Sequence, residues 1–415
     1  MASSKLAVIV LAAGQGTRMK SSLPKVMHPL AGRPMVSHLL DTVSSLKPDR
    51  MVVVVGPDME LVSRTVAPNP TVLQADRLGT GHAVAQAKAA LGEFDGDVLV
   101  LYGDTPLITA ETLERMLAER RGPRDPAVVV LGQRENPLCN SGVMAISGQR
   151  LWSLIERLDN KNSKGEYYLT DIVALARADG ATCSHVEGDP TELLGVNSRT
   201  ELAVAESLVQ ARLREAAMDG GATLIDPATV WLSWDTAIGK DVVVWPHVVF
   251  GPGVRVGDTV EIKGFCHFEG CTIESGATVG PFARLRPGAE IGEGAHIGNF
   301  VEIKKASVEA GAKVNHLTYI GDARIGAGAN VGAGTITCNY DGFNKSFTDI
   351  GKGAFIGSNS SLVAPVKIGD GAVIGAGSVI TKEVTAGALA VARGSQMELK
   401  GWAERFRAQH AKKKD

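Results

Sequence analysis

Residues 273–303 read IESGATVGPFARLRPGAEIGEGAHIGNFVEI, and in this stretch an aliphatic residue stands at every sixth position. The positions of this register are Ile273, Val279, Leu285, Ile291, Ile297 and Ile303. A fixed six-residue period is typical of a parallel β-helix, in which each unit forms one short strand and one corner of a triangular coil. The period therefore predicts a prism whose aliphatic side chains point inward.

The period extends in both directions from this stretch, from Val242 to Ile380. Its other members fall into four further registers of the same spacing. These are Val242, Val248, Val254 and Val260; then Val308, Val314 and Ile320; then Ile325 and Val331, with Thr337 in the next place; and last Ile350, Ile356, Leu362, Ile368, Ile374 and Ile380. Glycine often follows the aliphatic residue, as in Ile291-Gly292 and Ile356-Gly357. We expect this glycine to relieve the corner of the coil, where an unusual φ is needed.

One break interrupts the repeat, because Thr337 and Ile350 are 13 positions apart. We expect Cys338 to Asp349 to loop out of the coil. A tolerated surface insertion would explain such a loop. Its content of hydrogen-bonding residues favours a binding role instead, and these residues are Asn339, Tyr340, Asp341, Asn344 and Lys345.

The first half of the chain has a different pattern, in which short apolar runs alternate with helix-like stretches. The runs are Leu6–Leu11, Met51–Val55, Asp97–Leu101 and Ala127–Leu131, and the helical stretches include Met35–Ser45 and Gly81–Ala90. Valine-rich runs spaced by helices predict an α/β domain with a parallel sheet covered on both faces. A third pattern, Thr200–Met218, predicts a helix that ends at Gly220-Gly221. We therefore predict three parts: an α/β domain over 1–199, a helical linker over 200–221 and an all-β domain over 222–415.

Composition excludes several classes of protein. The formal charge of −2 gives no basic field for nucleic acid, and hydrophobic and charged contents of 44% and 21% are ordinary for a globular chain. We expect no membrane insertion, because no window holds 18 uninterrupted apolar residues, and we see no cleavable signal pattern. The five cysteines have unrelated spacings, which favours reduced thiols in the cytoplasm over disulfides, and Cys266 with Cys271 lacks the second pair that a zinc site needs.

A glycine-containing loop follows the first apolar run. It reads LAAGQGTRM over 11–19, where Gly14 and Gly16 allow the backbone to approach an anion. The loop lacks the third glycine of a dinucleotide fingerprint, and it lacks the Gly-Lys-Ser/Thr ending of a P-loop. Arg18 in the loop and Lys25 shortly after it place two cations beside this backbone, which predicts phosphate binding.

Longer motifs carry a resemblance to known families. Four motifs resemble segments of the sugar-nucleotide pyrophosphorylases: LAAGQGTRM, LPKVMHPLAGRPM (23–35), QADRLGTGHA (74–83) and LYGDTPL (101–107). The repeat resembles the left-handed β-helix acyltransferases, whose prisms associate as trimers. The combination is similar to a bacterial family that joins an N-acetylglucosamine-1-phosphate uridyltransferase to a glucosamine-1-phosphate acetyltransferase. The resemblance implies a Rossmann-like nucleotidyltransferase domain followed by a left-handed parallel β-helix of hexapeptide repeats.

The same resemblance implies two reactions in a cytoplasmic homotrimer. Acetyl-CoA would acetylate glucosamine 1-phosphate, and the N-acetylglucosamine 1-phosphate formed would then take a uridyl group from UTP with Mg²⁺, releasing pyrophosphate. In the uridyl site, Arg18 and Lys25 match catalytic residues, and Asp104 with Asn197 match the Mg²⁺ ligands. The matches to nucleotide and UDP-sugar contacts are Leu11, Ala12, Gly14, Lys25, Gln74, Gly79, Thr80, Tyr102, Asn140, Tyr168, Thr170 and Asn197.

This chain departs from the family in one segment. The family follows the strand at 127–131 with a longer stretch bearing a Tyr-Gly-Arg motif and a glutamate that hold the acetamido sugar. Here GQRENP (132–137) runs almost directly into Leu138-Cys139-Asn140, so these contacts have no counterpart. An alternative function is therefore acetyl transfer alone, with the uridyl site impaired.

For acetyl transfer, the resemblance places the general base at His316, in KVNHLTYIGDA (313–323). The matching sugar-phosphate contacts are Arg286, Lys304, Tyr319, Asn330 and Lys345. The matching acetyl-CoA contacts are Ala333, Asn339, Tyr340, Ser358, Ala376 and Arg393. A non-catalytic trimeric scaffold is a rival from another class, but a scaffold does not need a base beside a cationic pocket.

The repeat is followed by a last helical pattern, Met397–Ala411, with Trp402 and Phe406 on one side. We expect this helix to cover the open end of the prism and its exposed strand edge.

Overall fold

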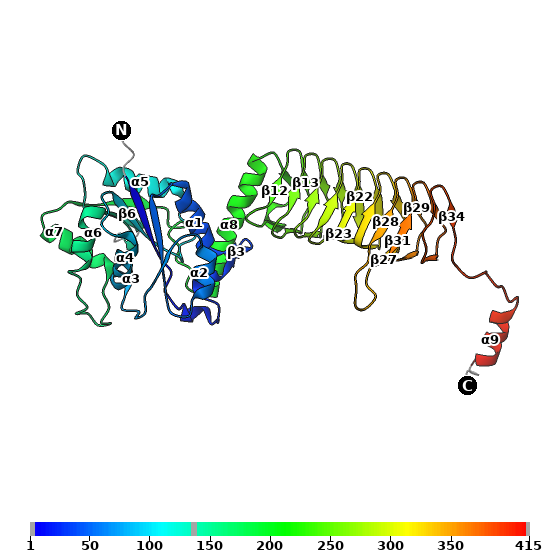
Figure 1. Ribbon diagram of the computed structural model, residues 1–415, viewed down its shortest axis with the longest axis horizontal. Helices are drawn as coiled ribbons and strands as arrows, with labels where there is room; N and C mark the ends of the chain where they lie inside the picture. Colours follow the sequence, from blue (N-terminus) through cyan, green and yellow to red (C-terminus); the bar gives the residue numbers. More distant parts are fainter. Residues whose placement is uncertain (1–4, 134–138, 412–415) are drawn as a thin grey trace. The chain divides into compact units, whose positions relative to one another are not determined.

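A computed structural model of the chain describes residues 5–133 and 139–411 (Figure 1). The chain divides into two units, which are described separately. Unit 1 holds residues up to Glu215 together with Leu232–Trp234, and unit 2 holds Ala216–Trp231 and the residues from Asp235 onward.

Unit 1 is built on a seven-stranded sheet of order β5-β4-β1-β6-β8-β7-β9. The strands are β1 (Leu6–Leu11), β4 (Arg50–Val55), β5 (Thr71–Leu73), β6 (Asp97–Tyr102), β7 (Val128–Gln133), β8 (Cys139–Ser147) and β9 (Cys183–Gly188). All four predicted apolar runs are strands of this sheet. A separate two-stranded sheet pairs β2 (Pro29–Leu30) with β3 (Arg33–Pro34).

The prediction of an all-parallel sheet is wrong for one strand. β8 runs antiparallel to both of its neighbours, β6 and β7, while the remaining pairs are parallel. The reason is the short connection after β7: a parallel return requires a crossover of a dozen or more residues, and an antiparallel return does not.

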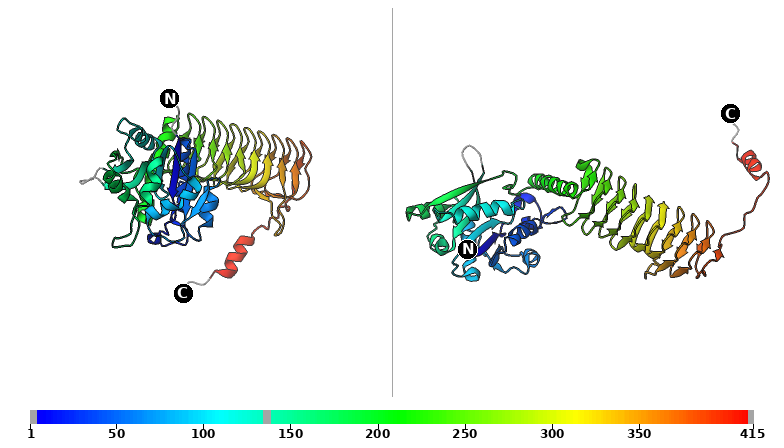
Figure 2. Two further views of the ribbon diagram at one scale, coloured as in Figure 1. Left: turned by 60° about the vertical axis from the view of Figure 1, so that its left-hand side comes forward. Right: turned by 90° about the horizontal axis from the view of Figure 1, so that it is seen from above.

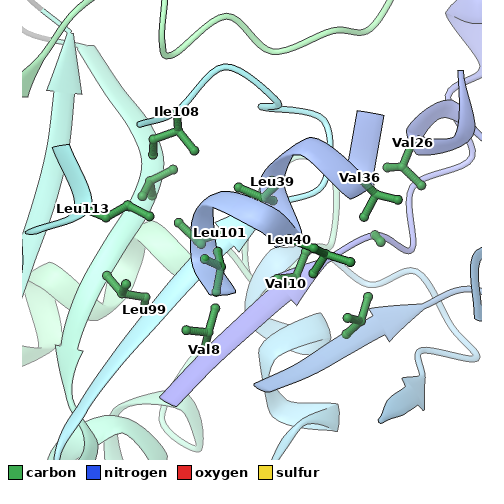
Figure 3. Close-up of a cluster of buried hydrophobic side chains, with 14 of the residues drawn as sticks. Val8, Val10, Val26, Val36, Leu39, Leu40, Leu99, Leu101, Ile108 and Leu113 are labelled. Carbon is green, nitrogen blue, oxygen red and sulfur yellow. The ribbon is translucent and has the colours of Figure 1, made fainter. Parts of the chain in front are cut away.

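Helices cover both faces of this sheet, as predicted. Val8 and Val10 of β1 belong to a buried cluster with residues of α1 (Met35–Ser45), α2 (Glu60–Val66) and α5 (Ala110–Arg120) (Figure 3). Ala7 and Ile9 point to the other face and a second cluster. That cluster includes residues of α3 (Thr80–Gln86), α4 (Lys88–Leu91), α6 (Gly148–Ile155) and α7 (Ile172–Ala178). The single helix expected over 81–90 is thus two, α3 and α4.

The helix predicted over 200–218 is α8 (Arg199–Asp219). Ala205 and Val209 on one side of α8 are buried with Leu30 and Leu107 of unit 1. Gly221, at φ 103°, follows the end of the helix, which agrees with the predicted glycine stop.

Unit 2 is a prism of stacked parallel strands, which Figure 2 shows one coil after another. Face 1 consists of β10 (Thr223–Leu224), β13 (Val243–Val244), β16 (Glu261–Ile262), β19 (Thr278–Val279), β22 (His296–Asn299), β24 (Lys313–His316), β26 (Asn330–Val331), β29 (Phe355–Ile356), β32 (Val373–Ile374) and β34 (Leu389–Ala390).

The other two faces are joined by two long strands, β23 (Glu302–Val308) and β25 (Tyr319–Ile325), which turn a corner at Lys305 and Asp322. The first halves of these strands lie on face 2 with β11 (Val230–Trp231), β14 (Val248–Phe250), β17 (His267–Phe268), β20 (Arg284–Leu285), β27 (Ile336–Cys338), β30 (Ser361–Val363) and β33 (Val379–Ile380). Their second halves lie on face 3 with β12 (Ala237–Ile238), β15 (Arg255–Val256), β18 (Thr272–Ile273), β21 (Ala289–Ile291), β28 (Thr348–Ile350) and β31 (Val366–Ile368).

The aliphatic residues of the six-residue period are buried in the prism, as predicted. The reason expected for the glycines that follow them is wrong. Gly292, Gly298 and Gly357 do not have positive φ. A Cβ on Gly298 would lie 1.9 Å from the carbonyl oxygen of Asn315, and one on Gly357 would lie 2.4 Å from the backbone nitrogen of Ala376. These glycines are therefore required by the close approach of the next coil.

The insertion and the last helix differ in part from their predictions. The loop spans 339–347, because Cys338 ends β27 and Thr348 begins β28, and it projects from the coil in Figure 1. The last helix, α9 (Trp402–His410), stacks Trp402 on Phe406, but none of its residues is buried. The expected cover of the prism is thus not formed, since residues 391–401 are exposed and contain no strand or helix that would hold α9 on the coil.

Within the described chain, no helix combines the length and apolar content that a membrane crossing requires. Cys183, Cys266, Cys271 and Cys338 are free thiols. Burial raises the pKa of Cys266 to about 11 and that of Cys271 to about 12.

Candidate active sites

Unit 1 contains a cavity of about 320 Å³ beyond the carboxyl ends of β1 and β6. Ligands commonly bind at this end of a parallel sheet. The predicted residues that line the cavity are Leu11, Ala12, Gly14, Lys25, Gln74, Gly79, Thr80, Tyr102, Asp104 and Tyr168. These residues come from five separate stretches of the sequence, so the fold assembles most of the predicted nucleotide site in one place.

Lys25 connects the two predicted metal ligands. Its Nζ donates to Oδ2 of Asp104 and, at 2.9 Å, to Oδ1 of Asn197. The backbone holds the two ligands together as well, because the nitrogen of Val196 donates to the oxygen of Asp104 at 2.8 Å. A carboxylate and an amide oxygen separated by 93 positions of sequence therefore converge on one cation.

This convergence tests whether Mg²⁺ would fit. Asp104 and Asn197 offer hard oxygen donors that already meet at one positive charge, which is the donor chemistry that Mg²⁺ prefers. Among the described residues, no group of three His, Cys, Asp or Glu gathers as a metal site. Two protein oxygens suit Mg²⁺, which commonly takes its remaining ligands from water and substrate phosphates.

The loop after β1 is shaped to pack against Lys25. Gly16 has φ 66°, and a Cβ there would lie 2.5 Å from Cβ of Lys25. Only glycine avoids both the strain and the collision. Two short 3-10 helices follow, Thr17–Met19 and Lys25–Met27, and they carry the two predicted catalytic cations.

Polar side chains are oriented around the cavity. Gln74 is buried and its Nε2 donates to the oxygen of Gly79 at 3.1 Å. The hydroxyl of Thr80 accepts from the nitrogen of Leu169 at 3.0 Å, which joins this wall to the segment before α7. Burial is the main reason why the pKa of Tyr102 rises to about 12, so its phenol remains a neutral donor.

Four predicted residues do not line this cavity. Arg18, Thr170 and Asn197 lie outside its wall. Asn140 is exposed and lines a different cavity, with Arg177 and His185. The shortened segment that precedes Asn140 lies largely outside the described residues, which resume at Cys139.

Sequence reasoning missed other residues of the wall, among them Arg77 and Glu166. Arg77 donates from Nε to the oxygen of Ala13 at 2.9 Å and so supports the loop after β1. Its place in QADRLGTGHA, beside a predicted nucleotide-binding segment, is the signal that could have identified it.

In unit 2, the predicted base His316 lies exposed at the end of β24. Its Nδ1 is 2.6 Å from Oδ1 of Asn299, which lies one coil earlier. Because this amide oxygen only accepts, Nδ1 carries the proton and Nε2 keeps the lone pair that a base needs. Asn299 was missed by sequence reasoning, since it lies in a different coil.

His316 belongs to a column of residues on successive coils. Val314, Val331, Ile356 and Ile374 are paired in that order on face 1. The residues two positions after these four are His316, Ala333, Ser358 and Ala376, so the predicted base and three predicted acetyl-CoA contacts share one edge, between faces 1 and 2. Nη1 of Arg393 donates to the oxygen of Ala376 at 2.7 Å and adds a fourth contact.

The predicted phosphate contacts gather on another edge, between faces 2 and 3. Lys304 lies just before the corner of β23, and it is close to Lys345 of the inserted loop and to Arg286. Hydrogen bonding to Lys345, together with the charges of Lys345 and Arg286, lowers the pKa of Lys304. Nη1 of Arg286 also donates to Oε1 of Glu302 at 2.9 Å. The three cations form a clamp suited to a phosphate dianion.

The clamp and the base lie at different corners of one chain. Leu317 and Asp322, both at positive φ, mark the two corners that bound face 2. His316 lies before the first corner, and Lys304 pairs with Gly321 beside the second. At about 3.3 Å per residue, at most about 16 Å of backbone joins positions 316 and 321 around the corner at Leu317.

Comparison with known proteins gives matches in both units. Residues 8–178 match the family described as MobA-like NTP transferase domain. Residues 270–305 and 347–382 match the family described as bacterial transferase hexapeptide (six repeats). Together with the stacked parallel strands, this match establishes a hexapeptide left-handed parallel β-helix.

Full-length relatives are also found. The chain is 82% identical over 445 positions to the bifunctional protein GlmU of Paramagnetospirillum magneticum, with 100% of this chain and 99% of the relative covered. It is 62% identical over 436 positions to the bifunctional protein GlmU of Rhodospirillum rubrum, with 98% of each chain covered. The alignment with the first relative is 30 positions longer than this chain of 415 residues, so this chain lacks residues that the relative has.

Proposed function

The chain belongs to the family of bifunctional GlmU proteins, and from this premise we propose which residues perform its two reactions. It is a nucleotidyltransferase and an acetyltransferase, and it uses Mg²⁺, UTP and acetyl-CoA. The two reactions are acetylation of glucosamine 1-phosphate and uridyl transfer to the product. Acetyl transfer alone, the alternative raised by the shortened segment, is not favoured.

For uridyl transfer, the conclusion is supported above all by the convergence of Asp104 and Asn197 on the ammonium of Lys25. An oxygen of the sugar 1-phosphate attacks the α-phosphorus of UTP, and the bond to pyrophosphate breaks. Arg18 and Lys25 neutralise the charge on the phosphates. Mg²⁺, held by Asp104 and Asn197, supplies further charge neutralisation when it is bound. Gln74, Gly79 and Thr80 orient the nucleotide.

For acetyl transfer, His316 is the general base. Its Nε2 accepts a proton from the amine of glucosamine 1-phosphate as the nitrogen attacks the thioester carbonyl of acetyl-CoA. The amide bond forms and coenzyme A leaves as a thiolate. Asn299 holds the tautomer in which Nε2 is free to accept. The coenzyme lies along the edge of Ala333, Ser358 and Ala376.

We further propose that the chain is a homotrimer in which each acetyl site lies between two copies. The placement of base and clamp on different edges supports this arrangement, because a neighbouring copy can present its clamp to the base. Asn330 lies on face 1 and would act with His316. Tyr319, Asn339 and Tyr340 would act with the clamp.

An exposed apolar edge also favours association of copies. His247, Phe265, Phe282 and Phe300 stack in succession along the corner between faces 1 and 2, with ring centroids 4.8, 4.9 and 5.1 Å apart. Leu317 continues this aromatic edge beside His316. The phenylalanines and Leu317 are 45–63% exposed in the single chain, and such a contiguous apolar surface is typical of a protein interface.

A mixing experiment tests the shared site. His316→Ala and Lys304→Ala chains are purified separately, mixed in equal amounts, dissociated and reassembled. If the base of one copy acts with the clamp of the next, about a quarter of the sites in random closed trimers hold two intact halves. We expect each variant alone to be nearly inactive and the mixture to regain about a quarter of wild-type acetyl transfer.

A mixture that stays inactive, while mixed trimers are seen by native mass spectrometry, would place the whole site in one chain. Uridyl transfer is measured in the same samples and should be constant, because both substitutions lie in unit 2. We also propose a cytoplasmic location, with functional limits of 1–199 for uridyl transfer, 200–221 for the linker and 222–415 for acetyl transfer.

A further inference from the structure

The first turn of α8 contacts the uridyl site at several points. α8 begins at Arg199, two residues after the proposed metal ligand Asn197. Neither Arg199 nor Glu201 lines the cavity. Both side chains nevertheless contact segments that carry proposed site residues, which suggests a role in holding those segments.

Arg199 joins two segments that are far from it in sequence. Its Nε donates to the oxygen of Met19 at 3.2 Å, and its Nη1 donates to Nδ1 of His28 at 3.2 Å. Met19 ends the short helix that carries Arg18, and His28 directly follows the short helix that begins at Lys25. A single guanidinium therefore connects the supports of both proposed catalytic cations.

The protonation state of His28 fixes which atom donates and which accepts in its contact with Arg199. His28 is 2% exposed. Burial, and then the charge of Arg199, lowers its pKa, so the ring is neutral. Because a guanidinium only donates, Nδ1 accepts and the proton lies on Nε2. The fork of Arg199 thus meets two fixed acceptors, one on each segment.

Glu201 fixes Asn197 from the same turn. Its Oε2 accepts from the nitrogen of Asn197 at 2.8 Å and from the hydroxyl of Ser198 at 2.9 Å. The carboxylate of Glu201 therefore holds the backbone of the proposed metal ligand from the first turn of α8.

We propose that Arg199 is a positioning residue for uridyl transfer, which holds the segments of Arg18 and Lys25 in register with Asn197 at the start of α8. The inference rests on the proposed uridyl site. It predicts that loss of Arg199 leaves every proposed substrate contact present but misaligned. Misalignment of about 1 Å costs on the order of a hundredfold in rate.

The test compares Arg199→Gln with Arg115→Gln in the full chain. Arg115 is a matched control in unit 1, since it is also exposed and donates to one backbone oxygen (Glu187, 3.1 Å) and one side chain (Thr112, 3.0 Å). We measure kcat and KM for UTP, acetyl transfer, and the melting temperature. Arg199→Gln should lower kcat of uridyl transfer ten- to a hundredfold with KM changed less than threefold, while Arg115→Gln keeps wild-type kcat.

A second variant separates positioning from structure. Arg199→Lys keeps the charge and a donor and should recover part of kcat, and both Gln variants should lose the same few degrees of melting temperature with normal acetyl transfer. Wild-type kcat in Arg199→Gln would overturn the proposal. Equal losses in uridyl transfer and acetyl transfer would also overturn it. If Arg199→Gln does not fold, a wild-type kcat in Arg199→Lys would overturn the proposal instead. Absence of uridyl transfer in the wild type would instead contradict the proposed function.

Discussion

The two units build their sites in opposite ways. In unit 1, the ends of parallel strands and the loops after them surround a cavity, so residues from Leu11 to Tyr168 meet inside one chain. In unit 2, the interior of the coil is filled by the repeating aliphatic residues. Functional side chains are therefore confined to the outer surface of the prism.

This difference shows why self-association matters to one unit in particular. An α/β sheet leaves an open crevice at its carboxyl edge, which loops can close without a partner. In the filled prism, hollows lie on the outer surface, such as the one lined by Phe282, Phe300 and Tyr319. The base column and the phosphate clamp of unit 2 lie on different edges of the prism. A neighbouring copy can place its clamp edge opposite the base edge of the first copy.

The largest expected effect separates the two sites. His316→Ala removes the proposed base and should lower acetyl transfer by 10²- to 10⁴-fold, while uridyl transfer to supplied N-acetylglucosamine 1-phosphate stays normal. Both rates are measured on one preparation, by release of free thiol and of pyrophosphate. His267→Ala is the matched control, because His267 is also exposed on the prism, where it contacts Glu269 instead of Asn299. If His267→Ala lowered acetyl transfer as much as His316→Ala does, the assignment of His316 as the base would be contradicted.

The reciprocal change should have the next largest effect. Asp104→Asn removes one negative charge from the proposed metal site and should lower uridyl transfer by about 10²-fold, because charge neutralisation is the main catalytic contribution there. The Mg²⁺ concentration for half-maximal rate should rise, and acetyl transfer should not change. Asp95→Asn, at an exposed carboxylate that contacts Gln149 in the same unit, serves as control. An unchanged Mg²⁺ dependence would contradict the assignment of Asp104.

Much of this contrast follows from the sequence. The strands of unit 1 and the inward positions of unit 2 obey local periodicity, which is why the runs at 6–11 and 273–303 predicted them. Local sequence patterns gave wrong predictions where contacts between distant segments determine the structure. The glycine after each aliphatic residue suggests a corner, but at Gly298 the deciding contact comes from Asn315 in the next coil.

The same limit explains the site residues that were missed. Asn299 contacts His316 from 17 positions away, and Arg199 contacts Met19 from 180 positions away. Neither pairing leaves a periodic trace in one sequence. Arg286 and His316 were identified by resemblance, yet only the coil register reveals that they lie on different edges of the prism.

The smallest predicted effect concerns the pH dependence of the clamp. Hydrogen bonding to Lys345 is the first cause that lowers the pKa of Lys304 below its ordinary 10.5, so Lys304 loses its charge at a lower pH than a typical lysine. In the wild type, KM for glucosamine 1-phosphate should therefore rise as the pH increases toward that lowered value.

Lys345→Ala should raise KM about fivefold near neutrality, because one charge-assisted contact to phosphate is lost. It should also move the alkaline rise in KM to higher pH, since Lys304 then keeps its proton longer. Lys367→Ala, on face 3, is the control. If Lys345→Ala shows the same alkaline rise in KM as the wild type, Lys345 does not act on Lys304. Lys345 and Lys304 would then not belong to one clamp, and the phosphate contacts would be separated from one another as the base and the clamp are.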